Sequence, residues 1–275
     1  YIATVNRQLP QHHKLAQLTV KTSTLCSEIT LPTGVDKDGR DRTAVCCLSS
    51  LNLEKYDEWK DDPDMINDVM RFLDNVLSDF INKAPEQFKD AKYSAERERS
   101  VGLGVMGFHS FLQQKRIPLE SVMSKSWNKK IFKNIHEKVN QASKDLAEER
   151  GACPDAAEYG FKERFSNKTA IAPTASISII CGGASPGVEP IAANSYTHKT
   201  LSGSFNVRNR YLEEILESHG KNDDETWSTI TTNQGSVSHL DFLTDLEKDV
   251  FKTAFELNQK WIIELSGDRT PYISQ

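Results

Sequence analysis

A thiol and a carboxylate stand two residues apart near the start of the chain, in the segment Ser-Thr-Leu-Cys-Ser-Glu-Ile-Thr-Leu-Pro at residues 23–32. In an extended backbone, alternate side chains share a face, so Cys26 and Glu28 would project from the same side. Together they could act on adjacent atoms of one substrate. The spacing by itself favours the plainer interpretation of a buried cysteine near an exposed glutamate, so the chemical interpretation stays a hypothesis at this point.

A second segment is rich in small hydroxylated residues. It reads Ala-Pro-Thr-Ala-Ser-Ile-Ser at residues 172–178 and continues as Cys-Gly-Gly-Ala-Ser-Pro-Gly-Val-Glu-Pro at 181–190. Between strand-like stretches, such a loop can aim backbone N–H groups and hydroxyls at an anion. It would then bind phosphate without Lys or Arg. A plain turn explains the same pattern, and both interpretations remain open.

Residues 102–107, Gly-Leu-Gly-Val-Met-Gly, match the G-x-G-x-x-G pattern of dinucleotide-binding proteins. That pattern requires a buried strand immediately before the first glycine. The preceding residues 94–100, Ser-Ala-Glu-Arg-Glu-Arg-Ser, are too charged for a core strand. We therefore reject a nicotinamide site here and predict a Gly-rich helix packed closely on a neighbour, with Met106, Phe108 and Phe111 in the contact.

The elements that must position these groups follow from hydrophobic periodicity. Short apolar stretches predict strands at residues 43–48, 168–172 and 177–181. Apolar residues at helical spacing predict helices at about 64–82, 127–150, 207–219 and 245–265. Residues 1–24 show no helical period, and the hydrophilic residues 221–226 predict a surface loop. Alternating helices and strands indicate an α/β fold, with residues 1–275 forming one domain or part of one.

Several helix ends carry their own signals. Asp62 and Pro63 stand where a capping residue and a first-turn proline belong. Gly151 follows the second predicted helix in the position of a C-terminal cap. Thr244 and Glu247 have the spacing of a capping box at the start of the last helix.

Composition narrows the functional class. The 275 residues carry 34 Lys and Arg against 39 Asp and Glu, a formal net charge of −5, which argues against a surface built to bind nucleic acid. The longest apolar runs are far too short to cross a bilayer. The N-terminus has neither an apolar signal-peptide region nor an initiator Met, which indicates a processed or excerpted chain.

The cysteines indicate a reducing compartment. Their number is odd and they are widely spread, unlike a secreted disulfide framework. The absence of Cys-x-x-Cys and of Cys/His clusters at zinc spacing argues against a structural zinc site. The five cysteines are best interpreted as reduced cytosolic thiols, each by default a small buried side chain: Cys26, Cys46, Cys47, Cys153 and Cys181.

Six ordered motifs resemble the catalytic large subunit of ribonucleotide reductase, of the class I, diphosphate-reducing kind. The resemblance runs from about residue 18 to the end, and residues 1–17 match nothing that can be placed. The motifs are Ser-x-Leu-Cys-x-Glu-Ile-x-Leu-Pro at 23–32, Ala-Val-Cys-Cys-Leu-Ser at 44–49, Gly-Leu-Gly-Val-Met-Gly-Phe at 102–108, Ile-Ala-Pro-Thr-Ala-Ser-Ile-Ser at 171–178, Ser-Pro-Gly-Val-Glu-Pro at 185–190 and Asp-Arg-Thr-Pro-Tyr-Ile at 268–273.

The resemblance implies part of a ten-stranded α/β barrel, with a finger loop threaded through its centre. It also implies that Cys26 becomes a thiyl radical that takes the 3′-hydrogen of the substrate ribose. Glu28 would accept the 3′-hydroxyl proton as general base. Cys46 would be one member of the redox pair that supplies electrons, with Cys47 pointing to the other face. Cys153 and Cys181 match no catalytic position and are expected to be structural.

The resemblance also implies a substrate-binding set. On the finger loop it comprises Ser23, Thr24 and Leu25, and at the expected diphosphate loop it comprises Pro173, Thr174, Ala175, Ser176 and Ile177. Thr24 stands where the family usually has Asn, whose carboxamide helps hold the substrate hydroxyls and interacts with Glu28. A threonine hydroxyl is shorter and offers one donor instead of two.

The implied cofactors and partners lie outside these residues. A metal-containing small subunit would generate the radical, thioredoxin or glutaredoxin would supply electrons, and ATP or deoxynucleotide effectors would bind elsewhere. No metal or cofactor site is expected in this segment, nor any nucleic-acid or membrane partner, and the compartment would be cytoplasmic. The remaining parts of the large subunit, including the second redox cysteine and the tyrosine pair that relays the radical, would precede residue 1 or follow Gln275.

Two alternatives stay open. The same barrel serves adenosylcobalamin-dependent reductases, and the Pro-Thr-Ala-Ser loop resembles that branch as well. The other alternative is a degenerate, non-catalytic fragment that only binds partners, for which Thr24 is the main support.

Overall fold

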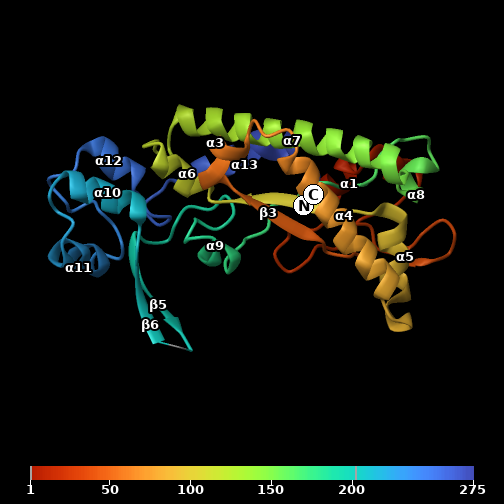
Figure 1. Ribbon diagram of the computed structural model, residues 1–275, viewed down its shortest axis with the longest axis horizontal. Helices are drawn as coiled ribbons and strands as arrows, with labels where there is room; N and C mark the ends of the chain where they lie inside the picture. Colours follow the sequence, from red (N-terminus) through yellow and green to blue (C-terminus); the bar gives the residue numbers. More distant parts are fainter. Residues whose placement is uncertain (1, 202) are drawn as a thin grey trace.

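The computed structural model describes residues 2–201 and 203–275, with helices around a short central strand pair (Figure 1). The strands are β1 (Gly34–Val35), β2 (Asp41–Arg42), β3 (Leu48–Asn52), β4 (Gly102–Met106), β5 (Ser195–Thr200) and β6 (Gly203–Arg208). The helices are α1 (Ile2–Gln8), α2 (Gln11–Leu15), α3 (Tyr56–Trp59), α4 (Met65–Lys83), α5 (Lys89–Glu98), α6 (Phe108–Gln114), α7 (Val122–Arg150), α8 (Pro154–Ala157), α9 (Ile177–Ile180), α10 (Arg210–Ser218), α11 (Asp224–Thr232), α12 (Asp245–Val250) and α13 (Gln259–Arg269). Short 3-10 turns cover Leu53–Lys55, Glu86–Phe88 and Thr270–Tyr272. Among these described residues, no helix combines the length and apolar character that a membrane span requires.

Strands β3 and β4 run parallel at the centre of the molecule, in a register that begins with Leu48 opposite Gly102. Every residue of β4 is buried. On the other edge of β4, Thr169 forms a parallel bridge with Leu103, so the chain around Thr169 follows β4 as a third, irregular row. This core, with helices packed on it, is the expected α/β architecture.

The glycines of β4 permit the third row to approach. A Cβ at Gly104 would collide with the Ala170 carbonyl oxygen, and a Cβ at Gly102 would stand 2.7 Å from the Ala170 side chain. The prediction of a Gly-rich helix at residues 102–108 is therefore wrong, because these glycines allow close packing between extended segments. The charged residues before β4 form α5, so the buried strand that a dinucleotide site requires before its first glycine is absent there.

Three strand predictions need correction. Strand pairing starts at Leu48 and not at residue 43, because β4 begins opposite Leu48. Residues 168–172 are extended but contribute a single bridge. Residues 177–181 form the one-turn helix α9 and the residue after it, because the left-handed backbone at Thr174 (φ 55°) turns the chain and the Thr174 carbonyl then accepts the Ser178 N–H.

Helices α4 and α7 pack against each other and against the strand pair, close to the predicted ranges. α7 begins at Val122, before the expected residue 127, because the Ser121 side chain accepts the N–H of Ser124 at 3.1 Å. It ends at Gly151, whose φ is 86°. The buried apolar residues of the two helices are Ile66, Met70, Leu73, Leu77 and Ile81 of α4, and Ile131, Phe132, Ile135, Val139, Ala142, Leu146 and Ala147 of α7.

Helices α10, α11 and α12 share a separate apolar core at one end of the molecule, where the hairpin β5–β6 projects (Figure 1). α10 begins at Arg210 and not at residue 207, because Asn209 caps it. α11 begins at Asp224, inside the loop predicted at 221–226, because Asp223 caps it by accepting the N–H of Thr226 at 2.7 Å.

The single helix predicted at 245–265 is two helices, α12 and α13. After Phe251, which is fully buried, the Thr253 N–H and hydroxyl both donate to the Glu256 carboxylate, at 2.8 and 2.9 Å. Asn258 then caps α13 by accepting the N–H of Lys260 at 3.0 Å. The predicted capping box at the start of α12 is present.

The N-terminal segment is more ordered than its sequence suggested. Residues 2–15 form α1 and α2, where no helical period was found, and Tyr1 lies outside the described residues. The chain from residue 17 to residue 33 contains no helix or strand, and we name it the finger loop.

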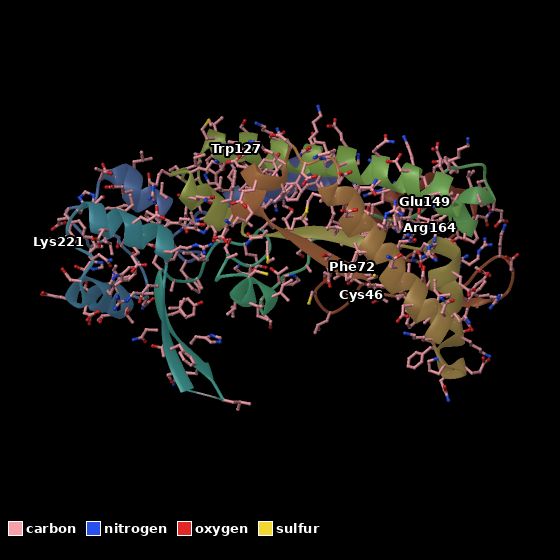
Figure 2. The ribbon with its side chains drawn as sticks, viewed as in Figure 1. Cys46, Phe72, Trp127, Glu149, Arg164 and Lys221 are labelled. Carbon is pink, nitrogen blue, oxygen red and sulfur yellow. The ribbon has the colours of Figure 1, made fainter. Side chains whose placement is uncertain are left out.

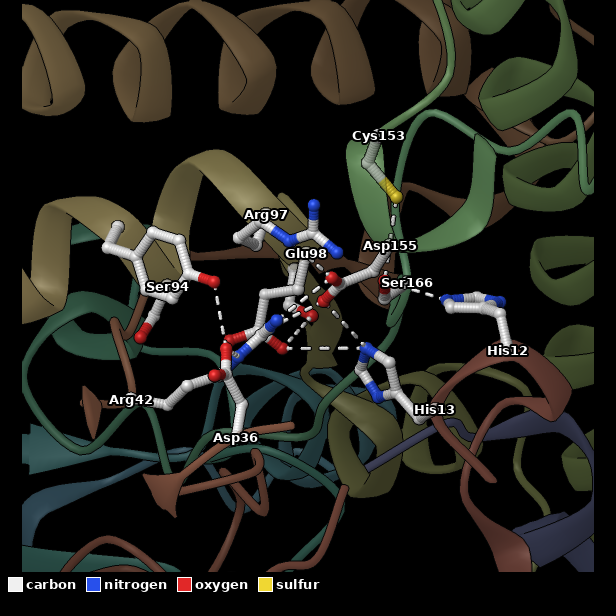
Figure 3. A network of polar contacts seen from close by, with 12 residues as sticks. His12, His13, Asp36, Arg42, Ser94, Arg97, Glu98, Cys153, Asp155 and Ser166 are labelled. Atoms are coloured by element: carbon white, nitrogen blue, oxygen red, sulfur yellow. Dashed lines mark hydrogen bonds and ion pairs between the residues drawn. The ribbon is translucent and has the colours of Figure 1, made fainter. Parts of the chain in front are cut away.

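Buried ion pairs hold the chain that follows the finger loop, and His13 from the chain that precedes the loop packs beside them (Figure 3). Asp155 of α8 accepts from both terminal nitrogens of Arg42 in β2, at 2.5 and 2.9 Å. Arg42 also donates to Asp36, which follows β1, at 3.1 Å. His13 of α2 lies 3.7 Å from Asp155 and 4.0 Å from Glu98 of α5. The ion pairs therefore fix the end of the loop that leads into β1 and β2, whereas α2 meets the same helices through packing of the buried His13 ring.

Glu98 gives this network a pH dependence that a glutamine substitution should remove. Burial, and next the charge of Asp155, raises the pKa of Glu98 from its ordinary 4.5 to about 8. The folded protein therefore keeps a proton that the unfolded chain has lost, and the free energy of unfolding falls as the pH rises towards about 8. Between about pH 6.5 and 8, we expect Glu98→Gln to reduce this fall by roughly 2 kcal/mol in denaturant unfolding.

The pH window excludes the main competing effect. Burial lowers the pKa of His13 to about 3, which costs stability only as the pH falls below about 6.5. Glu96→Gln, at an exposed position of the same helix, is the matched control and should leave the profile unchanged. A Glu98→Gln profile as steep as that of the unsubstituted protein would contradict the prediction.

Gly104→Ala should destabilise the protein, because the added Cβ would overlap the Ala170 carbonyl oxygen and force two backbone segments apart. We expect a loss of about 2–4 kcal/mol in the free energy of unfolding. Gly267→Ala is the control: a Cβ at that position of α13 meets no atom within 4 Å, and alanine should stabilise the helix by up to ~1 kcal/mol. Equal unfolding midpoints for the two variants would show that the close approach is unimportant.

Candidate active site

The finger loop folds back on itself through backbone hydrogen bonds. Thr33 donates its N–H to the Thr19 carbonyl at 3.2 Å, and Thr24 donates to the Ile29 carbonyl at the same distance. The Ser27 N–H then donates to the Thr24 carbonyl at 3.0 Å, and Ser27 itself has a φ of 63°. The tip of the loop is therefore a tight reversal over residues 24–29.

Apolar residues hold the returning limb of the loop in place. Ile29 and Leu31 are buried and form a small cluster with Ala170, the residue that packs on β4. Ala44 and Leu48 pack against the same cluster from the start of β3. The loop is therefore attached to both rows that flank β4, and its tip is positioned relative to them.

Cys26 and Glu28 at the tip line one cavity of about 460 Å³. Its far wall includes Pro173 and Gly187, from the two parts of the small-residue segment. The Cys26 thiol is exposed and forms no disulfide. Cys26 and Glu28 thus share a cavity that opens on the chain leading into the predicted anion-binding loop, but the predicted extended alternation is wrong, because the chain turns at Ser27, which lines the same cavity.

Thr24 orients the carboxylate. Its hydroxyl donates to Glu28 Oε2 at 2.9 Å and accepts the N–H of Ile29 at 3.4 Å. The other two predicted finger-loop contacts do not line the cavity: Ser23 is half-buried and Leu25 is fully exposed. Thr24 is also outside the cavity wall, so it acts on the cavity through Glu28.

Cys46 lies within electrostatic range of the finger tip. Burial raises the pKa of its thiol, and the charges of Glu28 and Cys26 contribute to the shift. Figure 2 shows Cys46 at the loop that enters β3, away from helix α7. Cys47 points into the core, where its thiol donates to the Leu73 carbonyl at 3.7 Å and burial raises its pKa to about 11. The two neighbouring cysteines face opposite sides, as predicted.

The loop at residues 173–177 is held by its second residue, Thr174. Thr174 is buried, its hydroxyl accepts the Gly187 N–H at 2.8 Å, and its carbonyl accepts the Ser178 N–H at 3.0 Å. Ala175, Ser176 and Ile177 are exposed, and of the five predicted loop residues only Pro173 lines the cavity. The loop therefore presents its small residues outward beside the cavity.

The cavity residues that were not predicted from the sequence include Thr30, Arg269 and Gln275. The buried Thr30 Oγ1 and Gln275 Oε1 atoms have no hydrogen-bond partner among the described residues. Arg269 is buried, donates to Asn128 Oδ1 at 2.9 Å, and has its pKa lowered to about 10, mainly by burial. Arg269 belongs to the Asp-Arg-Thr-Pro-Tyr-Ile motif at residues 268–273, which could have indicated it.

The other two cysteines, Cys153 and Cys181, lie outside the cavity wall. Cys153 is buried beside Ser166, and Cys181 is exposed just after α9. Across residues 2–201 and 203–275, no group of three or more His, Cys, Asp or Glu side chains is arranged to hold a metal ion.

A parallel strand core with a thiol-bearing loop beside it defines this chain as part of an α/β barrel. The model of the ribonucleotide reductase barrel-domain family matches residues 1–164 and 155–275. The chain belongs to this family, as the six motifs suggested.

Individual proteins that are similar to this chain support the same family assignment. A ribonucleoside-diphosphate reductase large subunit of Invertebrate iridescent virus 6 is 52% identical over 254 residues, covering 91% of this chain and 26% of that protein. The corresponding protein of Invertebrate iridescent virus 3 is 45% identical over 278 residues, covering 100% of this chain and 43% of its own length. Among solved structures, the Actinobacillus ureae class Id ribonucleotide reductase alpha subunit superposes with a TM-score of 0.91 at 39% identity, covering 100% of this chain and 50% of that one. This chain spans half or less of the length of these relatives.

Proposed function

We propose that this chain is the part of a class I ribonucleoside-diphosphate reductase large subunit that carries the radical cysteine. It would help to convert ribonucleoside diphosphates into 2′-deoxyribonucleoside diphosphates. The observation that carries the proposal is the convergence of Cys26, Glu28 and Pro173 on one cavity, with Cys46 in electrostatic range. The relatives' names, which specify diphosphate reductases and a class Id subunit, support the substrate class and the reductase class.

Each proposed role matches the chemistry of its side chain. The Cys26 thiyl radical takes the hydrogen from C3′ of the ribose, and Glu28 accepts the 3′-hydroxyl proton. Thr24 holds Glu28 in place through its 2.9 Å hydrogen bond. The 2′-hydroxyl leaves as water, and Cys46 and a second cysteine outside this chain are oxidised to a disulfide as they supply two electrons. Cys26 then returns its hydrogen to C3′.

The diphosphate would bind at the loop of Pro173, Thr174, Ala175, Ser176 and Ile177. Its recognition would rely on backbone N–H groups and hydroxyls, since these residues include no cationic side chain. Ser23, Thr24 and Leu25 would form the finger-loop edge of the substrate site.

The proposal requires partners. A metal-containing small subunit would generate the radical, and thioredoxin or glutaredoxin would reduce the disulfide. The rest of the large subunit would complete the barrel and bind ATP and deoxynucleotide effectors. The protein would act in the cytoplasm.

Loss of Cys26 should end turnover. In the complete reductase, we expect Cys26→Ser to reduce deoxynucleotide formation to background while nucleoside diphosphate still binds, because an alcohol O–H bond is too strong to be converted readily into a radical. Cys46→Ser should allow at most a single turnover with a dithiol reductant. Cys181→Ser, at an exposed thiol outside the cavity wall, is the control and should retain near-normal activity. Multiple turnovers by Cys26→Ser would exclude the proposed function.

Thr24 should tolerate asparagine but not valine. Thr24→Val keeps the side-chain shape but removes the donor to Glu28, and we expect kcat to fall about tenfold, equivalent to about 1.4 kcal/mol. Thr24→Asn can restore the donor and add a second one near the ribose hydroxyls, so its kcat should equal or exceed that of the unsubstituted enzyme. A markedly less active Thr24→Asn enzyme would mean that the threonine is itself adapted to this site.

A further inference from the structure

A pair of buried serines joins the helix after β4 to the segment that follows α9. The Ser185 N–H donates to Ser110 Oγ at 2.9 Å, and the Ser110 N–H donates to Ser185 Oγ at 3.1 Å. The Ser185 carbonyl accepts the Gly107 N–H at 2.7 Å. The residues retain 5% and 1% of their exposure, so water cannot readily replace these bonds. We name this pair the serine clamp.

The clamp continues to the expected diphosphate loop through Gly187, two residues after Ser185. The Gly187 carbonyl accepts the Phe108 N–H at 3.4 Å, and the Gly187 N–H donates to Thr174 Oγ1 at 2.8 Å. A Cβ at Gly187 would lie 3.0 Å from the Ala172 carbonyl oxygen, and its φ is 50°, so both space and conformation favour glycine. Any shift of the clamped segment would therefore be transmitted directly to Thr174.

Thr174 determines the shape of the loop. It is buried and left-handed, and it binds Gly187 through its hydroxyl and Ser178 through its carbonyl. A left-handed threonine is strained, and such a conformation persists only where its surroundings hold it. Of these two hydrogen bonds, the one with Ser178 lies within the loop and α9, whereas the one with Gly187 is made with a residue outside both.

The loop cannot rely on charge to compensate for poor geometry. Residues 173–177 include no Lys or Arg. Two arginines lie near the loop: Arg210 donates to the Gly182 carbonyl at 3.2 Å and is paired with Glu54, and Arg269 of the cavity wall donates to Asn128. Neutral donors bind an anion well only when they already point at it, because reorganising them costs binding free energy.

We propose that Ser110 and Ser185 are positioning residues for diphosphate binding: by clamping the segment after α9 to the end of β4, they hold Thr174, and through it the anion-binding loop, in the shape that receives the substrate's phosphates. The inference rests on the proposed function. It adds a specific requirement, namely that substrate affinity depends on two serines that line neither the cavity nor the loop.

The test compares ligands with and without phosphate in the complete reductase. We expect Ser185→Ala to raise the KM for the nucleoside diphosphate about tenfold while kcat stays within about twofold. The inhibition constant of inorganic pyrophosphate should rise to a similar extent, whereas that of the phosphate-free nucleoside should not change. Ser110→Ala should behave in the same way, and the double variant should raise the KM further, because each single variant removes one of the two clamp hydrogen bonds.

A buried serine elsewhere controls for general destabilisation. Ser124 is fully buried at the start of α7, where its hydroxyl donates to the Leu119 and Ser121 carbonyls. Ser124→Ala should lower stability without changing pyrophosphate inhibition. If Ser185→Ala does not fold, Thr174→Val tests the same connection, because it removes the acceptor of the Gly187 N–H.

The outcomes separate this inference from the proposed function. Three outcomes would overturn the positioning role. The clamp variants could lose nucleoside and pyrophosphate affinity equally, they could keep both affinities unchanged, or Ser124→Ala could show the same selective loss. The affinities of pyrophosphate and of the nucleoside can also be measured by equilibrium binding, which does not require turnover, so the role of Cys26 could fail while the clamp survives, and the reverse. A selective loss of phosphate affinity in both clamp variants would support the inference.

Discussion

The close approach of backbone segments along β4 is the constraint on which the candidate site depends. Because Gly104 has no side chain, Ala170 can lie directly against it, and the chain that leads to Pro173 must follow the strand. Strand β3 follows the opposite edge, and Cys46, two residues before it, lies at the start of the parallel rows, whereas Pro173 lies at their end. The end of β4 at Gly107 holds the segment that contacts the anion-binding loop. A single buried strand thus sets the spacing of groups that are far apart in the sequence.

The finger loop adds a second requirement, because it contains little regular structure and must still present two side chains accurately. Its returning limb is fixed by burial of Ile29 and Leu31 against Ala170. The chain that follows it is fixed by the ion network around Arg42 and Asp155. Burying such charges is costly, and the cost is offset only when each charge has several well-directed partners, as Asp155 has.

Different parts of the site present the reactive groups and orient them. The reactive groups lie at an exposed loop tip, where a substrate can reach the Cys26 thiol. The groups that orient them are hydroxyls in short hydrogen bonds, such as that of Thr24 to Glu28. The neutral anion-binding loop is shaped by contacts to the buried core. Such an arrangement suits chemistry in which a reactive thiol needs access while the substrate must be held in one orientation.

Local patterns in the sequence were sufficient for several features. The apolar spacing of α4 and α7 and the cap at Gly151 are properties of short windows, because helical backbones repeat over a few residues and extended backbones show an alternation between two faces. The order of six motifs was enough to indicate the family. The opposite orientations of Cys46 and Cys47 followed from the same alternation.

Other features were decided only by tertiary structure. Residues 102–106 are compatible with several conformations because glycine is permissive, and packing against Ala170 selects the strand. Residues 177–181 have a strand-like composition, but the contact of Thr174 with Gly187 turns the chain into a helix. Arg269 reaches the cavity of the finger tip from the opposite end of the chain. Each of these outcomes depends on contacts between segments distant in sequence, and no local window of residues contains the atoms that make those contacts.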